Sequence, residues 1–239
     1  MARNSGGRRF AAGLTAVAVG VATSAAAPPQ DRCKALEPVG TDGRLLGHLP
    51  YAGVSAQALT PSPPSVAENC RTNREALPDL AALMAKARAD GITTLYVVSC
   101  HRSAQRQRTL FCTGGAPSLT AAERARQVAP AGFSEHATGY AVDFADRKAP
   151  ACVVEQCFGA TAASKWLIAN APKFGFELSF PDGNLQGVVY EPWHWRWIGR
   201  DETATARQIF NDARTRFPAP ASQPVKPSES GETTAAPSP

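Results

Sequence analysis

The sequence lacks the features that mark several common classes of protein. Its main apolar run, FAAGLTAVAVGVA at 10–22, is shorter than the roughly 20 residues that span a bilayer. It contains no C-x-x-C pair, which is the usual spacing of zinc-binding thiolates, and no internal repeat. Its charge excess is small, with 25 basic and 20 acidic residues. These absences argue against a thiolate zinc domain, a repeat protein and a protein held in the membrane by several helices.

The N-terminus predicts export. A basic start, MARNSGGRR, precedes the apolar run, and the small residues SAAA follow it, which is the pattern of a secretory signal peptide over residues 1–27. We expect cleavage near Ala26 or Ala27 and a protein in the periplasm or outside the cell, without stable membrane insertion; an uncleaved anchor is the alternative. Cleavage would remove the three arginines of this segment and leave 22 basic residues against 20 acidic ones. This balance gives no support to nucleic-acid binding.

Six cysteines follow the predicted signal peptide. An even number of cysteines in an oxidising compartment indicates disulfides. Short spacing favours the pairs Cys152–Cys157 and Cys100–Cys112, which leaves Cys33–Cys70, although spacing alone does not determine the pairing.

Composition divides the rest of the chain into three parts. Residues 28–45 form a lead-in segment, 46–217 a single folded domain, and 218–239 a disordered tail rich in Pro, Ser, Thr and Ala. Within the domain, periodicity predicts helices at 77–91, 103–111, 120–129, 161–175 and 202–217, and strands at 92–99, 139–146, 175–180 and 192–199. Strands and helices do not alternate regularly. We therefore expect an α+β fold with a small, mostly antiparallel sheet and helices packed around it.

Two short motifs place a histidine near an acidic residue. SEHATGYAVDF holds His136 seven residues before Asp143, and EPWHWRW holds His194 three residues after Glu191. Side chains alternate between the two faces of a strand, so three tryptophans (193, 195 and 197) share one face and His194 lies on the other. Asp143 likewise lies opposite its apolar neighbours. If the two strands are neighbours, Asp143 and His194 converge, and His136 can reach them through the turn at Gly139.

Two imidazoles and one carboxylate, with a fourth position left to water, are a typical ligand set of catalytic Zn²⁺. Glu191 is then the natural base for that water. Each residue also has a plainer interpretation: His194 as a half-exposed strand histidine, Asp143 as a solvent-facing carboxylate, and Glu191 as a helix cap or ion-pair partner of Arg196.

Together these motifs resemble those of the VanY-type zinc D-alanyl-D-alanine carboxypeptidases among the LAS-type peptidoglycan peptidases. The family pattern S-x-H-x-x-G-x-A-x-D, followed by E-x-W-H, is complete in this chain, and the segment CHRSAQRQ is similar to an upstream family segment. The resemblance covers about 46–200. It implies that His136, Asp143 and His194 bind zinc and that Glu191 is the general base. It further implies that Arg102 grips the substrate and that the pocket is lined by Ser134, Gln107 and Tyr190.

The upstream segment departs from the family at two positions, with His101 for the usual tyrosine and Cys100 for the usual glycine. This leaves the shape of the substrate end open. A surface charge on a basic helix is the alternative interpretation of Arg102. His101 is expected in a surface loop, and His48 is expected to be structural.

The resemblance implies an exported, monomeric zinc peptidase that hydrolyses the C-terminal D-alanine of peptidoglycan stem peptides, with D,D or L,D specificity undecided. The alternatives are an endopeptidase of the same fold and a non-catalytic, zinc-containing module that binds the cell wall.

Overall fold

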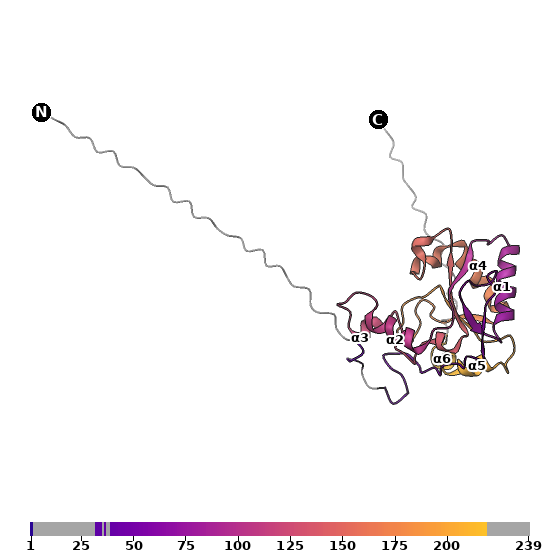
Figure 1. Ribbon diagram of the computed structural model, residues 1–239, viewed down its shortest axis with the longest axis horizontal. Helices are drawn as coiled ribbons and strands as arrows, with labels where there is room; N and C mark the ends of the chain where they lie inside the picture. The colour runs from indigo at the N-terminus through magenta and orange to yellow at the C-terminus, as the bar shows by residue number, and fades with distance from the viewer. Residues whose placement is uncertain (2–31, 35, 37–38, 219–239) are drawn as a thin grey trace, which may run out of the picture.

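The structure of the chain is a computed structural model that describes residues 1, 32–34, 36 and 39–218 (Figure 1). The predicted signal peptide, apart from Met1, and the predicted tail, apart from Pro218, lie outside the described residues. Among the helices that the structure does describe, none is both long and apolar enough to cross a membrane.

The centre of the fold is a four-stranded antiparallel sheet with the order β3-β4-β6-β5. Its strands are β3 (Leu95–Ser99), β4 (Ala141–Asp146), β5 (Phe176–Leu178) and β6 (His194–Trp197), and a separate two-stranded sheet pairs β1 (Leu59–Pro61) with β2 (Arg71–Asn73). The α-helices are α1 (Leu77–Ala89), α2 (Ala104–Thr113), α3 (Ala121–Ala125), α4 (Ala162–Asn170), α5 (Thr205–Ile209) and α6 (Asn211–Arg216). Short 3₁₀ helices are η1 (Glu135–Thr138), η2 (Pro150–Cys152), η3 (Gln156–Ala160) and η4 (Ala171–Phe174). The predicted α+β class with a small antiparallel sheet is confirmed.

Helices α1 and α4 cover one face of the sheet, and α2 and α3 lie at the opposite side of the molecule (Figure 1). The core between the sheet and helices α1 and α4 contains Leu80, Leu83, Leu167, Val142, Phe144 and Trp195. Because Val142 of β4 pairs with Trp195 of β6, the apolar positions of the two strands face the helices together. The alternation of side chains in EPWHWRW therefore predicted the core face correctly.

Three predicted helices differ from the structure. The segment 120–129 is α-helical only over α3, which ends at Ala125. The segment 161–175 stops being α-helical at Asn170 and continues as η4, because Pro172 has no N–H to donate in an α-helix. The segment 202–217 forms two short helices, α5 and α6, that meet at Phe210. This side chain is fully buried, with its ring 5.6 Å from that of Tyr51, so the chain bends where Phe210 enters the core.

The disulfides are Cys33–Cys112, Cys70–Cys100 and Cys152–Cys157. Of the pairs that spacing favoured, only Cys152–Cys157 is correct. Helix α2 begins soon after Cys100 and carries Cys112 away from it, whereas Cys70, just before β2, lies beside the end of β3. The Cys70–Cys100 bond therefore links the loop before β2 to the residue that follows β3.

Candidate active site

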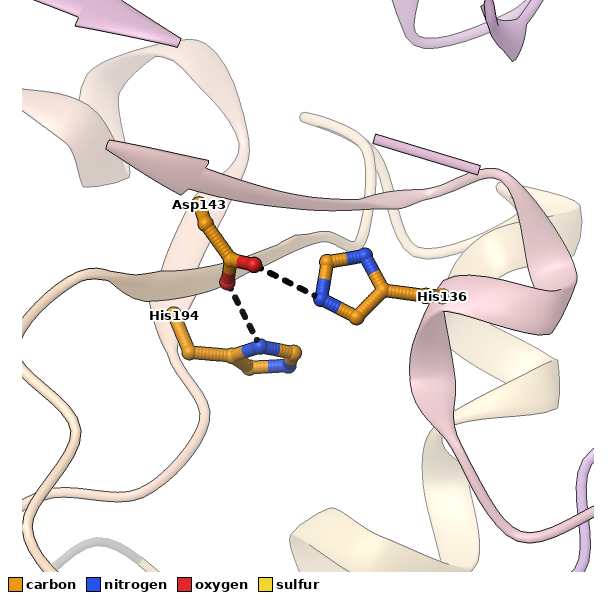
Figure 2. A group of neighbouring side chains, drawn as sticks. All are labelled: His136, Asp143 and His194. Atoms are coloured by element: carbon orange, nitrogen blue, oxygen red, sulfur yellow. Dashed lines mark hydrogen bonds and ion pairs between the residues drawn. The ribbon is translucent and has the colours of Figure 1, made fainter. Parts of the chain in front are cut away.

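Three buried side chains, those of His136, Asp143 and His194, point toward one another (Figure 2). Asp143 and His194 alternate with core residues along their strands, so they lie on the sheet face that points away from α1 and α4. His136 Nε2 lies 3.1 Å from Asp143 Oδ2, and His194 Nδ1 lies 3.0 Å from Asp143 Oδ1. One ligand atom from each residue falls within 4.8 Å of the others. The three residues whose convergence the motifs predicted do lie together.

The strand register and one turn produce this convergence. Asp143 of β4 is the direct cross-strand partner of His194 of β6, so both side chains project from the same face at neighbouring positions. His136 lies in η1, which ends at Gly139 with a left-handed φ of 73°. A Cβ at Gly139 would lie 2.7 Å from Leu59 Cδ2, so glycine is required both for the conformation and for the space.

The second nitrogen of each imidazole is already engaged. His136 Nδ1 lies 2.7 Å from the carbonyl oxygen of Cys100, and His194 Nε2 lies 3.0 Å from Glu135 Oε2. Both partners are acceptors, so these nitrogens carry the protons and donate. The remaining nitrogens, Nε2 of His136 and Nδ1 of His194, both face Asp143, and a bound cation would replace any proton that they carry. This is the arrangement in which outer hydrogen bonds orient metal-binding histidines, and the donor set fits Zn²⁺ with a position left open.

Glu135 connects the site to a buried ionic network that the sequence interpretation missed. Its Oε1 accepts from Arg196 Nη1 at 2.7 Å, and its Oε2 accepts from Ser179 Oγ at 2.6 Å as well as from His194. Arg196 in turn donates to Glu177 at 2.7 Å. A signal for this network was present: alternation placed Arg196 on the same face as His194, and a buried guanidinium requires a carboxylate.

The charges of the site follow from these contacts. Burial alone would raise the pKa of Glu135, but Arg196 and His194 outweigh it and hold that pKa below its usual range. Burial would likewise raise the pKa of Asp143, and the two histidines lower it instead. For His194 burial acts in the opposite direction, and hydrogen bonds to Asp143 and Glu135 raise its pKa to about 10. Both carboxylates are therefore ionised, and their negative charge favours a cation bound by Asp143 and the two rings.

Glu191 is buried beside the three residues. Its Oε2 lies 4.0 Å from His194 Nδ1, and its backbone carbonyl accepts from the His194 N–H at 3.0 Å, so a single turn through Pro192 sets their relative position. Arg196 forms its ion pairs with Glu135 and Glu177, so the alternative in which Glu191 pairs with Arg196 is not observed in these described residues. Burial raises the pKa of Glu191 to about 8. A carboxyl group with such a pKa can both accept and release a proton near neutral pH.

A cavity of about 1000 Å³ is lined by His136, Asp143, His194 and Glu191. Arg102 and Ser134 line it, and so does Gln107. Gln107 is buried; its Oε1 accepts from Arg102 Nη1 at 3.0 Å and its Nε2 donates to the Ala129 carbonyl, so its contacts hold Arg102 in place. Arg102 also donates to Ser99 Oγ at 3.1 Å and lies 3.5 Å from Asp143 Oδ2, so it reaches into the site.

The other predicted positions lie as follows. Tyr190 is not among the residues that line the cavity; its ring packs against Gly159. His101 is partly exposed and lines the cavity. His48 also lines it, but its side chain is buried and lies 2.6 Å from the carbonyl oxygen of Ala125, in keeping with a structural role.

Comparisons with known proteins point to one family. The profile of the VanY family, described as D-alanyl-D-alanine carboxypeptidase, matches residues 69–200, more than half of the chain. The chain is 35% identical over 130 residues to "Putative carboxypeptidase YodJ" of Bacillus subtilis (strain 168), covering 53% of this chain and 46% of that protein.

Two solved structures have a similar fold. The LD-carboxypeptidase LdcB, whose structure is described as revealing the basis of peptidoglycan recognition, superposes with a TM-score of 0.52 and 27% identity over 69% of this chain and 77% of that one. VanYB in complex with D-alanine-D-alanine superposes with a TM-score of 0.50 and 26% identity over 69% of this chain and 88% of that one. The chain spans less than half the length of the curated relatives it matches.

Proposed function

The chain belongs to the VanY family of D-alanyl-D-alanine carboxypeptidases, and we propose that it is an exported zinc peptidase that removes the C-terminal D-alanine from peptidoglycan stem peptides. The observation that carries this proposal is the convergence of His136, Asp143 and His194 in one cavity with Glu191. The three disulfides support export, since such bonds persist in oxidising compartments.

His136 Nε2, a carboxylate oxygen of Asp143 and His194 Nδ1 would hold the zinc ion. Zinc bound there acts as a Lewis acid that polarises the scissile carbonyl and makes water more acidic. The buried carboxylate of Asp143 offsets part of the cation's charge. The hydrogen bonds from the outer ring nitrogens to Cys100 and Glu135 keep the two imidazoles in the tautomer that binds a metal.

Glu191 is the proton carrier. Its carboxylate takes a proton from the water molecule whose oxygen attacks the scissile carbonyl carbon. The same carboxyl group then delivers that proton to the nitrogen of the departing D-alanine as the C–N bond breaks. In the metal-free protein, burial raises the pKa of Glu191 to about 8. A cation at the site would lower this pKa, so the ionised carboxylate that accepts the proton would be favoured near neutral pH.

Arg102 binds the free carboxylate of the terminal D-alanine. Its guanidinium is held by Gln107 and Ser99 on the wall of the cavity, and its side chain is 17% exposed, so it can still meet a ligand. A planar guanidinium can hold a carboxylate with two parallel hydrogen bonds. This contact requires a free C-terminus and therefore favours a carboxypeptidase over an endopeptidase. The presence of Glu191 in the same cavity argues against a non-catalytic binding module.

Product analysis tests the proposal. Purified protein is incubated with stem tetrapeptide and pentapeptide, with and without a chelator, and the products are identified by mass spectrometry. We expect loss of a single alanine, abolished by the chelator and restored by zinc. Loss from the pentapeptide indicates D,D specificity and loss from the tetrapeptide L,D specificity; release of a longer peptide, or no product, contradicts the proposal.

A matched pair of variants tests the mechanism. Glu191→Ala should bind zinc but release no alanine, whereas Glu202→Ala, which replaces an exposed glutamate outside the cavity, should retain full activity. Turnover by Glu191→Ala equal to that of the wild type would rule out Glu191 as the proton carrier.

A further inference from the structure

The cavity extends well beyond the four residues of the proposed chemistry. It runs along all five residues of β3, from Leu95 to Ser99, and on to Thr93. Its volume of about 1000 Å³ is at the upper end of the range of ligand sites, roughly 300–1000 Å³. A terminal D-alanine needs only a small part of this space, so the rest is available to the chain that precedes it.

Strand β3 is an edge of the central sheet, and its outer edge faces this cavity. In an antiparallel pair, hydrogen-bonded and non-hydrogen-bonded positions alternate. The Thr94 carbonyl accepts from the Arg147 N–H, so Thr94 and Tyr96 point their backbone groups toward β4. Leu95 and Val97 must then point their N–H and C=O groups outward. Within the described residues, these outward groups have no recorded hydrogen bond.

The free edge leads directly to the proposed active site. Ser99, at the end of β3, is the strand partner of Asp143 and accepts a hydrogen bond from Arg102. At about 3.3 Å per residue, the five residues of β3 can accompany an extended peptide of about four residues. A peptide whose C-terminus lies at Arg102 would run parallel to β3, since β3 itself ends at the site.

The walls beside this edge are cationic. Four exposed arginines line the cavity: Arg71, Arg88, Arg106 and Arg147. Apart from Asp143, Glu135 and Glu191, the cavity lining has one acidic side chain, Glu68. None of the four arginines makes a salt bridge with any residue in the described ranges.

Three of these arginines are held in place by uncharged groups. Arg71 donates to the Leu59 carbonyl, Arg88 donates to the Ser65 carbonyl, and Arg147 lies 4.4 Å from the centre of the Tyr96 ring. Their charges are thus positioned but not neutralised, which favours an anionic ligand.

We propose that the free edge of β3 and the flanking arginines bind the substrate upstream of the scissile bond as an added parallel strand, and that they select peptides carrying free carboxylates there. This inference rests on the proposed function, because it identifies the cavity as the substrate site. Backbone hydrogen bonds to Leu95 and Val97 would supply sequence-independent affinity, and the arginines would supply the selectivity.

The test uses three acetylated synthetic peptides that end in D-Ala-D-Ala: a tripeptide, a pentapeptide with two glutamates upstream, and the same pentapeptide with two glutamines. We expect kcat/KM for the glutamate peptide to exceed that for the glutamine peptide about fivefold, mostly through KM, as expected for exposed charge pairs. The ratio should approach one in the double variant Arg71→Gln/Arg147→Gln. It should persist in Arg74→Gln, which removes an exposed arginine that also donates to a carbonyl but does not line the cavity.

A second series tests the added strand in the wild-type protein, independently of whether the arginine variants fold. Each backbone amide of the glutamate pentapeptide is N-methylated in turn. Alternate residues of a strand face its neighbour, so we expect KM to rise at every second position. Equal kcat/KM for the glutamate and glutamine peptides, or an insensitive N-methyl series, overturns the inference.

The two proposals fail in distinguishable ways. If the tripeptide releases D-alanine but the pentapeptides show no preference, the proposed binding of upstream residues at β3 is wrong and the proposed function stands. If no peptide releases D-alanine, the proposed function fails. Calorimetric binding of the same two pentapeptides then tests the binding of upstream residues at β3 by itself: tighter binding of the glutamate peptide supports it, and equal binding overturns it.

Discussion

Replacing Glu135 by glutamine should weaken zinc binding although Glu135 is not a ligand. Its two carboxylate oxygens each accept from an obligatory donor, Oε1 from Arg196 and Oε2 from the His194 N–H. A glutamine side chain offers one oxygen and one NH₂ group in that place, so it can satisfy only one of the two donors. Both donors are buried, so the one that loses its acceptor instead faces the NH₂ group of the glutamine.

The magnitude follows from burial. Removing one partner of a buried ion pair costs about 3 kcal/mol or more, and loss of an outer hydrogen bond to a metal-binding histidine weakens metal binding roughly 10- to 100-fold. Glu177→Gln is the matched control, because it also removes a carboxylate from Arg196 but does not touch His194. The Glu177 side chain is 27% exposed, so we expect a smaller loss of stability, about 1 kcal/mol, and little change in zinc affinity.

Two measurements are needed. Zinc affinity is obtained by competition with a chromogenic chelator, and the free energy of unfolding of the chelated protein by urea titration. The reasoning is refuted if Glu135→Gln binds zinc within about twofold of the wild type, or if Glu177→Gln loses as much zinc affinity as Glu135→Gln.

Three further predictions concern single side chains in or near the site. Arg102→Lys should raise KM for D-alanine release about tenfold or more while zinc content is unchanged, because lysine cannot form the paired hydrogen bonds; an unchanged KM would remove Arg102 from substrate binding. Tyr190→Phe should change kcat/KM less than about twofold, because Tyr190 does not line the cavity, and a larger loss would restore its predicted pocket role. In chelated protein, burial raises the Glu191 pKa from 4.5 to about 8, so the folded state retains a proton that the unfolded chain has lost between these values. Glu191 should therefore make unfolding easier as the pH rises from about 5 to 8; urea titrations of Glu191→Gln should show a weaker decline over this window, and equal slopes would contradict the assignment.

Alternation along β4 and β6 predicted which side chains would meet on the condition that the two strands are neighbours. It placed Asp143 and His194 on one face and the tryptophans on the other, and the observed register pairs the two metal-binding candidates directly. Strand geometry is local, so a short motif carries the information.

The missed features depend on contacts between distant segments. The disulfides could not be predicted from spacing, because Cys70 and Cys100 meet through the packing of β2 against the end of β3. The alternative interpretation of His194 as a half-exposed strand histidine was wrong, since the loop and 3₁₀ turn that carry Glu135 cover that face and bury it. The role of Gln107 as a support for Arg102 likewise depends on how α2 packs against Ala129.

Cys100 takes part in two bonds through different atoms. Its sulfur is joined to Cys70, and its carbonyl oxygen accepts from His136 Nδ1. Oxidation of the thiols therefore fixes the position of the acceptor that orients a metal-binding ring. By linkage, closing this disulfide should increase metal affinity, and bound metal should favour its closure by the same factor. Redox maturation and metal loading of the chain are then one coupled equilibrium.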